Sequence, residues 1–309
     1  MSFNKLSLFR SFTINLLKFT LAKLILRICA WLPLGMVQAV AGALGKLMNW
    51  RPTRMKQTTV KNLSECFPDL TAEQLGNLTR LSLQHTAMTS LEMGKCWLWP
   101  VEKTMGMIVQ VEGEEVLEEA RSTGKGVVLL GPHLGNWELF GYYFSEQIPS
   151  TFMYQAPKNK HFDMMIKSAR SRGHARLAPA SSQGVGVLLK ALKKGELVGI
   201  LPDQEPAVES GDFAPFFGVP ALTMTLVTRL VNRTGARVIC GYAERLPKGQ
   251  GFKIIIKRAD PLIYHSDPKK SLEGLNRSVE ECVNQAKEQY QWEYKRFKRR
   301  PDGSRFYLK

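Results

Sequence analysis

From Pro100 onward, short apolar runs alternate with longer segments in which apolar residues recur every three or four positions. Runs of strand length cover residues 107–113, 127–133, 151–156, 197–204, 237–246 and 252–259. Helical periodicity covers residues 114–122, 135–147, 160–172, 184–194 and 223–235. Strands that alternate with helices of this length are typical of an α/β sheet covered on both faces. The pattern therefore predicts an α/β fold with a mixed, mostly parallel sheet flanked by helices.

The chain before Pro100 has a helical pattern. In residues 71–97 apolar positions recur at helical spacing, and Thr71 has the pattern of an N-cap. At the other end, a helical pattern over residues 271–297 runs into a basic tail. We predict three parts. They are an N-terminal membrane-anchoring segment (1–50), a helical subdomain (51–102) and an α/β domain with a basic C-terminal helix and tail (103–309).

The first 64 residues combine apolar side chains with positive charge. They contain ten basic residues and no acidic one, because the first carboxylate is Glu65. Pro33 falls inside the charge-free stretch 28–45, which is borderline for a membrane span of about 20 residues. We predict an N-terminal helix in, or lying along, the cytoplasmic membrane face, held by apolar area and anionic lipid. A single span is the second interpretation and a buried core helix the third.

The whole chain is strongly basic. Its 43 Lys and Arg against 27 Asp and Glu give a net charge of +16, which implies an anionic partner such as phospholipid headgroups, nucleic acid or an acidic protein. The basic residues gather at an apolar N-terminus and no nucleic-acid-binding motif occurs, so we expect no nucleic acid. The five cysteines are scattered without C-x-x-C spacing, which predicts neither a zinc site nor a disulfide framework and fits a reducing cytoplasm.

Candidate chemistry follows the apolar run that ends in GPHLGNWE, residues 131–138. Five positions on a helix amount to about 500° of rotation, so His133 and Glu138 would not share a helix face. They can meet only if His133 lies in the Gly-Pro turn and Glu138 in the first turns of the next helix. This end of a strand is where α/β proteins place ligands. A histidine oriented by a carboxylate is the base half of a catalytic triad, so we predict that Glu138 orients His133.

Several other chemistries lack their motifs. The sequence has no G-x-S-x-G segment, no P-loop and no complete dinucleotide fingerprint. We therefore expect no cofactor and no metal. A base without its own nucleophile indicates that the substrate supplies the hydroxyl, as in direct transfer to an alcohol.

The segment HLGNWE (133–138) resembles the H-x4-D/E motif of the lysophospholipid acyltransferase superfamily. With Glu in place of Asp, it resembles the branch that adds secondary acyl chains in lipid A biosynthesis, the lauroyl and myristoyl acyltransferases. The resemblance continues in NLSECFPDL (62–70), LPDQEP (201–206), FAPFFG (213–218) and EQYQWEYKRFKRRPDG (288–303), and so spans nearly the whole chain. A bare H-x4-E recurs by chance, whereas these segments in order are specific. The resemblance implies a glycerol-phosphate acyltransferase-like fold at the cytoplasmic face of the bacterial inner membrane.

The resemblance also implies a reaction. His133 would be the general base that deprotonates an acceptor hydroxyl, which attacks the thioester of an acyl carrier protein, while Glu138 holds His133. The acceptor would be a lipid A precursor. The substrate-binding residues implied are Asn136, Trp137, Arg170, Asp203, Gln204, Phe216 and Phe217.

One segment departs from the family pattern. An arginine often precedes the proline of a Y-x-P-x-N segment in the family, but Gln155 and Ala156 stand there in this chain. Lys158 could compensate by contacting an acceptor phosphate. The basic cluster 295–300 is expected to contact the acidic carrier protein or anionic headgroups. An E-G-T-R type segment, typical of glycerophospholipid enzymes, is absent, which favours a lipid A precursor. The alternatives are another lysophospholipid or glycolipid acceptor and, from a different class, a non-catalytic membrane scaffold.

Overall fold

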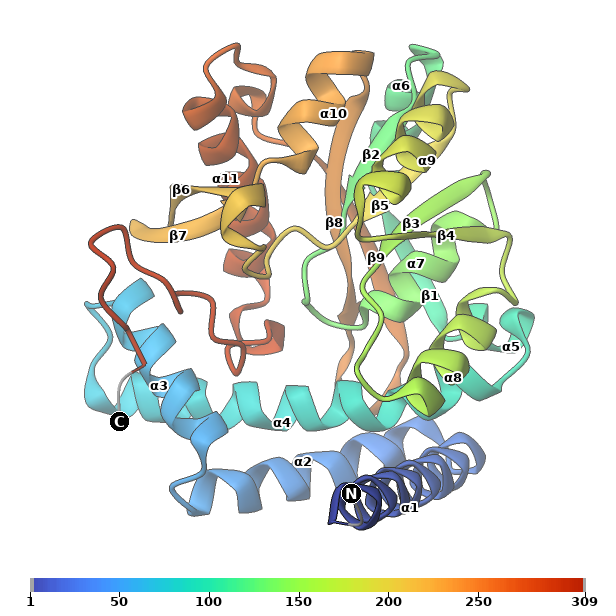
Figure 1. Cartoon of the computed structure of the whole chain (residues 1–309), viewed down its shortest axis with the longest axis vertical. Helices are drawn as coiled ribbons and strands as arrows, with labels where there is room; N and C mark the ends of the chain where they lie inside the picture. The colour runs from blue at the N-terminus through green and yellow to red at the C-terminus, as the bar shows by residue number, and fades with distance from the viewer. Residues whose placement is uncertain (1–2, 308–309) are drawn as a thin grey trace.

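The computed structural model describes residues 3–307, with side chains from residue 16 onward. Its centre is a seven-stranded sheet in the order β1-β9-β8-β2-β5-β3-β4 (Figure 1). The pairing of β8 with β9 is antiparallel and the other pairings in this sheet are parallel. The strands are β1 (Ile108–Glu112), β2 (Val127–Leu130), β3 (Ser150–Tyr154), β4 (Ala175–Pro179), β5 (Leu197–Ile200), β8 (Arg237–Arg245) and β9 (Phe252–Arg258). The predicted mixed, mostly parallel sheet is confirmed.

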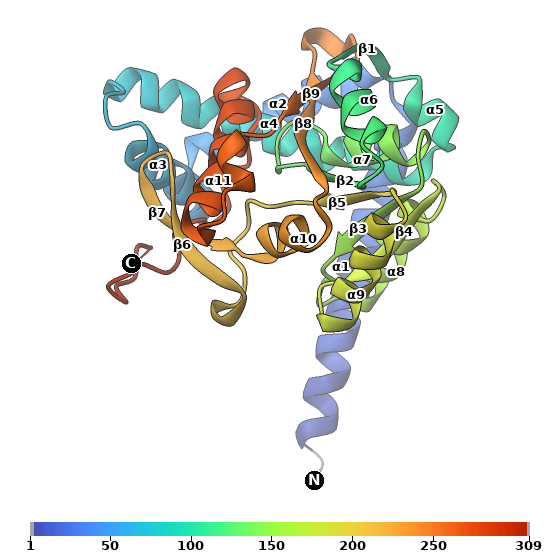
Figure 2. The same cartoon turned by 90° about the horizontal axis from the view of Figure 1, so that it is seen from above.

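Helices cover both faces of the sheet, as predicted (Figure 2). The longer helices are α1 (Phe3–Trp31), α2 (Leu34–Trp50), α3 (Arg54–Cys66), α4 (Ala72–Leu98), α5 (Val101–Met105), α6 (Glu114–Ser122), α7 (Trp137–Ser145), α8 (Lys160–Arg170), α9 (Ser182–Lys193), α10 (Leu226–Thr234) and α11 (Pro268–Gln285). Residues of α9, α10 and α11 build the core on one face, and residues of α5, α6 and α7 build it on the other.

Strand β2 lies in the middle of the sheet, between β5 and β8. All four of its residues are buried, and alternate side chains enter the two cores: Val128 and Leu130 on one face, Val127 and Leu129 on the other. The neighbouring strands are parallel to β2, and Leu130 pairs with Ile200 at the carboxyl end of β5. The segments that leave β2 and β5 therefore begin side by side at one edge of the sheet.

The N-terminal helices pack on α4, on its side away from the sheet (Figure 1). Two glycines allow the close approach: a Cβ on Gly45 would lie 2.4 Å from the Gln84 Cα atom, and one on Gly94 would lie 2.3 Å from the Leu26 carbonyl oxygen. Helices α1 and α2 are separate elements with Pro33 between them. Within the described residues, no helix combines the length and the apolar character that a membrane span requires.

One strand of the main sheet and a separate hairpin were not predicted from the sequence. Strand β4 follows α8 where the sequence pattern predicts no strand, and β6 (Gly211–Phe216) pairs with β7 (Val219–Met224) in a separate two-stranded sheet. The hairpin takes up the first residues of the helix expected over 223–235, which begins instead at Leu226. Because β6 contains prolines and lies outside the main sheet, its sequence lacks the continuous apolar run of a central strand.

The last predicted helix is too long. Helix α11 ends at Gln285, and a short 3₁₀ helix (Lys287–Gln289) follows. The chain then runs back past the site in turns, and we call residues 289–297 the C-terminal strap. Arg296 in the strap is buried and donates to the Leu222 carbonyl oxygen. Arg299 and Arg300 pair with Glu205 and Glu65. Arg296, Arg299 and Arg300 of this basic cluster therefore have partners within the protein, whereas Lys295 and Lys298 are exposed.

Candidate active site

His133 and Asp203 form the centre of the candidate site. The imidazole Nδ1 lies 2.9 Å from Asp203 Oδ1, and the His133 backbone N–H donates to Asp203 Oδ2, also at 2.9 Å. The His133 side chain is 14% exposed and that of Asp203 is 3% exposed. Both carboxylate oxygens therefore hold the same residue, which fixes the ring as well as the backbone of the turn.

The predicted partner of His133 was wrong. No hydrogen bond joins His133 to Glu138 in the part of the chain that the structure describes. Instead, both oxygens of Glu138 accept from Arg170, from Nε at 3.1 Å and from Nη2. Glu138 is the second residue of α7 and Arg170 is the last residue of α8, so the pair joins the two helices. The Glu138 side chain is 3% exposed and that of Arg170 is 21% exposed.

Both carboxylates are ionised at neutral pH. Burial alone would raise the pKa of Asp203, but the charge and hydrogen bonds of His133 outweigh it and hold the pKa below its ordinary value. Burial likewise raises the pKa of Glu138, and the charge and hydrogen bonds of Arg170 more than reverse this. An ionised Asp203 accepts a hydrogen bond from Nδ1–H of the neutral imidazole. The lone pair is then on Nε2, which lies 3.1 Å from the Gln204 side-chain nitrogen.

Backbone hydrogen bonds hold the turn that carries His133. The Gly131 N–H donates to the Ile200 carbonyl oxygen, so the turn starts against the end of β5. The His133 carbonyl oxygen accepts from Gln291 N–H in the C-terminal strap, at 3.0 Å. Gly135 has a φ of +60°, and a Cβ there would lie 2.0 Å from the Ala243 carbonyl oxygen. Glycine is required at this position because the backbone is left-handed and passes close to β8.

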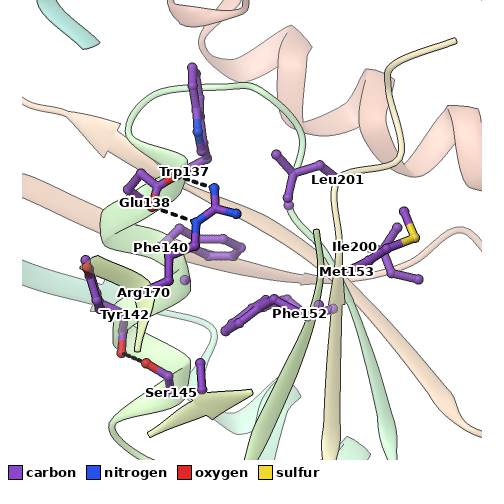
Figure 3. A pocket seen from close by; sticks show the side chains of 15 residues that line it. Trp137, Glu138, Phe140, Tyr142, Ser145, Phe152, Met153, Arg170, Ile200 and Leu201 are labelled. Atoms are coloured by element: carbon purple, nitrogen blue, oxygen red, sulfur yellow. Dashed lines mark hydrogen bonds and ion pairs between the residues drawn. The ribbon is translucent and has the colours of Figure 1, made fainter. Parts of the chain in front are cut away.

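An apolar pocket opens beside this turn, between α7 and the sheet (Figure 3). It has about 580 Å³ of empty space, part of it open to solvent. The ion pair of Glu138 and Arg170 lies at one end, and Trp137 lines the pocket and packs edge-on against the His133 ring with 4.9 Å between centroids. The apolar walls include Leu129, Phe140, Phe152, Met153, Ile200 and Leu201. A pocket of this composition suits a hydrocarbon chain whose polar end stays near His133.

Some predicted site residues lie elsewhere. Asn136 is fully buried behind the turn, where its side chain accepts from the Leu139 N–H as the N-cap of α7. Lys158 is exposed just before α8. Phe216 is 1% exposed and packs in a core cluster of aromatic rings, so the expectation that it borders a substrate groove is wrong. Phe217 is half-buried beside Phe216 and is not among the residues that line the pocket.

Trp137, Asp203 and Gln204 contact the His133 ring, and the Glu138–Arg170 pair follows Trp137 at the start of α7. Sequence reasoning missed Tyr290 of the strap, which pairs with Leu134 in a β-bridge. Burial raises the pKa of the Tyr290 hydroxyl well above its usual range, and the charge of the nearby Asp203 raises it further. Tyr290 lies in the segment EQYQWEY (288–294), whose apolar spacing predicted a helix and gave no indication of a contact with Leu134.

Comparison with known proteins shows the family of this chain. A family model described as bacterial lipid A biosynthesis acyltransferase matches residues 10–299. A lipid A biosynthesis lauroyltransferase of Escherichia coli K12 is 28% identical over 273 residues, 88% of each chain. The palmitoleoyltransferase of the same strain is 29% identical over 251 residues, 81% of each chain. The myristoyltransferase is 25% identical over 266 residues, 85% of this chain and 79% of the relative. This chain therefore belongs to the family of bacterial lipid A biosynthesis acyltransferases and is an acyltransferase.

Proposed function

We propose that this enzyme moves a fatty acyl chain from the thioester of an acyl carrier protein to a hydroxyl of a lipid A precursor. The observation that carries the proposal is the imidazole of His133, held at Nδ1 by a buried carboxylate beside an apolar pocket. The names of the relatives support the acceptor class, since each acts in lipid A biosynthesis.

His133 acts as general base through Nε2. It takes the proton of the acceptor hydroxyl as the oxygen attacks the thioester carbonyl carbon, and Asp203 stabilises the imidazolium that forms. When the tetrahedral intermediate collapses, the carbon–sulfur bond breaks and His133 returns the proton to the leaving thiolate. Gln204 donates to Nε2 in the resting site and must yield this position to the hydroxyl.

Arg170 supplies positive charge for the oxyanion or for an acceptor phosphate. Its Nε and Nη2 are used by Glu138, which leaves Nη1 for a substrate oxygen. A guanidinium held at two points loses little freedom when a third contact forms. Glu138 in this account positions Arg170 and keeps it charged, since the pKa of Arg170 is raised by the Glu138 carboxylate against the opposing effect of burial.

The pocket receives the acyl chain. Its far wall lies at the sheet, where the ring of Phe152 occupies the space above Gly199, with a ring carbon only 2.1 Å from where a Cβ on Gly199 would be. A bulkier or smaller side chain at position 152 would therefore change the depth available to the hydrocarbon.

The proposed location is the cytoplasmic face of the bacterial inner membrane, and the exposed side chains of the first two helices support it. Large apolar side chains are exposed along both helices, and we call this set the α1–α2 apolar surface: Leu17, Leu21, Leu24, Ile25, Ile28, Trp31, Met36, Val40, Leu44, Leu47 and Trp50. No acidic residue occurs before Glu65, so a bilayer with anionic headgroups is the occupant that matches both the apolar area and the charge.

Acyl transfer is tested directly with detergent-solubilised protein, an acyl carrier protein charged with a mixture of chain lengths, and a tetra-acylated lipid A precursor. Mass spectrometry should find one added acyl chain on the precursor. A gain only on a lysophospholipid or another glycolipid would move the acceptor and keep the mechanism. No transfer to any of these acceptors would contradict the proposal and support a scaffold.

A further inference from the structure

A buried carboxylate lies directly behind the turn that carries His133. Glu92 of α4 is 0% exposed and does not line the pocket. Each of its oxygens accepts two hydrogen bonds. Oε1 accepts from Arg245 Nε at 2.6 Å and from the Gln38 amide at 3.0 Å. Oε2 accepts from Arg245 Nη2 at 2.6 Å and from the Asn136 amide at 3.2 Å. One carboxylate thus joins α2, β8 and the start of α7.

The same arginine reaches the turn by a second route. Arg245 Nη2 donates to the Thr89 hydroxyl oxygen at 2.7 Å, and the Thr89 hydroxyl donates to the Gly135 carbonyl oxygen at 3.0 Å. Gly135 and Asn136 are consecutive, so the ion pair of Glu92 and Arg245 holds two neighbouring residues of the turn. They lie between His133 and Glu138 in the sequence, so they belong to the segment that carries both site residues.

The chemistry of Asn136 explains why asparagine stands there. As N-cap of α7, its side-chain oxygen accepts from the Leu139 N–H at 3.0 Å, while its amide nitrogen donates to Glu92. Asp or Ser would cap the helix about as well. Asp could not donate to Glu92 and would add a second buried negative charge, and the shorter Ser would not reach it. Asparagine alone among the good caps performs both tasks.

Stability alone does not require an ion pair at this place. Replacing a buried pair by apolar side chains of similar volume is often neutral or stabilising, because desolvation offsets the attraction between the charges. What four directed hydrogen bonds on one carboxylate provide is a fixed geometry. In this structure the fixed parts are the turn after β2 and the N-terminus of α7.

We propose that Glu92, together with Arg245, is a positioning residue for acyl transfer: through Asn136 and Gly135 it fixes the turn that places His133 against Asp203 and Glu138 against Arg170. This inference rests on the proposed function, because it takes His133 as the base. A base displaced by about 1 Å can cost about a hundredfold in rate, so the effect belongs in kcat and not in the binding of the acyl donor.

Two variants test the proposal in the full-length enzyme. Asn136→Ser retains a cap for α7 and breaks the link to Glu92. The double variant Glu92→Met/Arg245→Met removes both charges without leaving one buried alone. For each we expect kcat to fall about 10- to 100-fold while KM for the acyl carrier protein stays unchanged. The control is Glu119→Gln/Arg258→Gln, which removes an ion pair whose side chains are 61% and 65% exposed and should leave kcat unchanged.

A second measurement separates positioning from general damage. In a His133→Ala background only the Glu138–Arg170 pair remains to be displaced, so adding Asn136→Ser should lower the residual rate by a smaller factor than it lowers the wild-type rate, whereas a general loss of structure would lower both by the same factor. If Glu92→Met/Arg245→Met shows no cooperative thermal unfolding, Asn136→Ser decides alone.

Wild-type kcat in Asn136→Ser would overturn the inference, and so would an equal loss in the His133→Ala background. A separate result bears on the proposed function: if His133→Ala itself retains near-normal turnover, the base assignment fails whatever the state of the network behind it.

Discussion

His133 and Asp203 occupy equivalent places after two neighbouring parallel strands. Leu130 at the end of β2 pairs with Ile200 at the end of β5, and each site residue follows its strand partner by three positions. Because the two residues follow paired positions by the same number of residues, their side chains lie at the same edge of the sheet. There the imidazole nitrogen and the carboxylate oxygen are 2.9 Å apart. The register of the sheet thus brings together the proposed base and its carboxylate partner from segments 70 residues apart.

Asp203→Asn should lower kcat by about three to four orders of magnitude with the fold intact. The amide nitrogen would donate to Nδ1, which would force the proton onto Nε2 and remove the base. The measurement is steady-state transfer together with a thermal melt. The matched variant is Glu138→Gln, which we expect to lose less activity because Glu138 does not bond to His133. A larger loss in Glu138→Gln than in Asp203→Asn would contradict the assignment.

Glu138 and Arg170 should behave as one unit. Because Arg170 is held at two points by Glu138, removing either partner frees the other. We expect Glu138→Gln and Arg170→Gln each to lower kcat/KM by roughly 10- to 1,000-fold. The double variant should have about the same kcat/KM as the less active of the two single variants. Additive losses in the double-mutant cycle would show that the two side chains act independently.

The stability of the protein should fall with acidification below about pH 6.5. Burial, helped by the charge of Arg245, lowers the pKa of His85 from 6.5 to about 3, so the unfolded chain binds this proton first as the pH falls. The contribution of His85 to the free energy of unfolding should then drop by about 1.4 kcal/mol per pH unit between pH 6 and pH 4. Below about pH 4, Asp203 and Glu138, whose pKa values are lowered in the fold, add to the loss.

Urea unfolding of His85→Gln measures the contribution of His85. The glutamine side-chain oxygen can still accept from Arg245 Nη1, which lies 3.0 Å from His85 Nδ1, but it does not titrate. The variant should lose most of the slope between pH 6 and pH 4 and keep the loss below pH 4. An unchanged slope would show that His85 is already exposed to protonation in the folded protein.

Phe152→Leu should shift the acyl preference toward longer chains. The shorter side chain opens the wall above Gly199, and each further methylene buried is worth about 0.8 kcal/mol, roughly fourfold in kcat/KM. Competition between acyl carrier proteins of different chain length, read by mass spectrometry, measures the shift. The control is Phe213→Leu, another half-buried phenylalanine, which does not line the pocket. Identical preferences in both variants would place the end of the acyl chain elsewhere.

The α1–α2 apolar surface should carry membrane binding. Leu21 and Leu47 are 57% and 55% exposed, and Leu21→Gln/Leu47→Gln should weaken sedimentation with vesicles that contain anionic lipid by about tenfold. Val109 and Val208 are exposed to the same extent, at 58% and 56%, but lie outside this surface. Val109→Gln/Val208→Gln should bind vesicles like the wild type. Equal weakening in both double variants would show that the α1–α2 apolar surface is not the part of the protein that binds the membrane.

The elements of the sheet were predictable from the sequence because its central strands are continuous apolar runs. Strands β2 and β5 each have four residues, all buried, and an apolar run of this length between turns is typical of a central strand. Strand β4 has a mixed pattern with one buried residue, and the β6–β7 hairpin contains prolines, so neither has a clear period. Helical spacing in residues 286–297 reflects aromatic side chains that pack from a non-helical strap.

The sequence indicated which residues form the candidate site, but not which of them bond to one another. His133, Glu138, Arg170 and Asp203 were all named, yet the carboxylate that orients His133 depends on which strand lies beside β2. That order is set by tertiary packing, and an H-x4-E spacing suggests a local partner instead. Glu92 and Arg245 gave no signal, because a charged residue on an apolar helix or strand shows its partner only when the fold brings it there.

The central claim is that His133 removes the proton from the acceptor hydroxyl. The most direct test is transfer by purified His133→Ala, compared with wild type at equal protein and saturating acyl carrier protein and lipid A precursor. The account predicts a loss of about 100- to 10,000-fold in kcat with an unchanged melting temperature. Turnover within a few-fold of wild type would contradict it, and would require another group to act as the base.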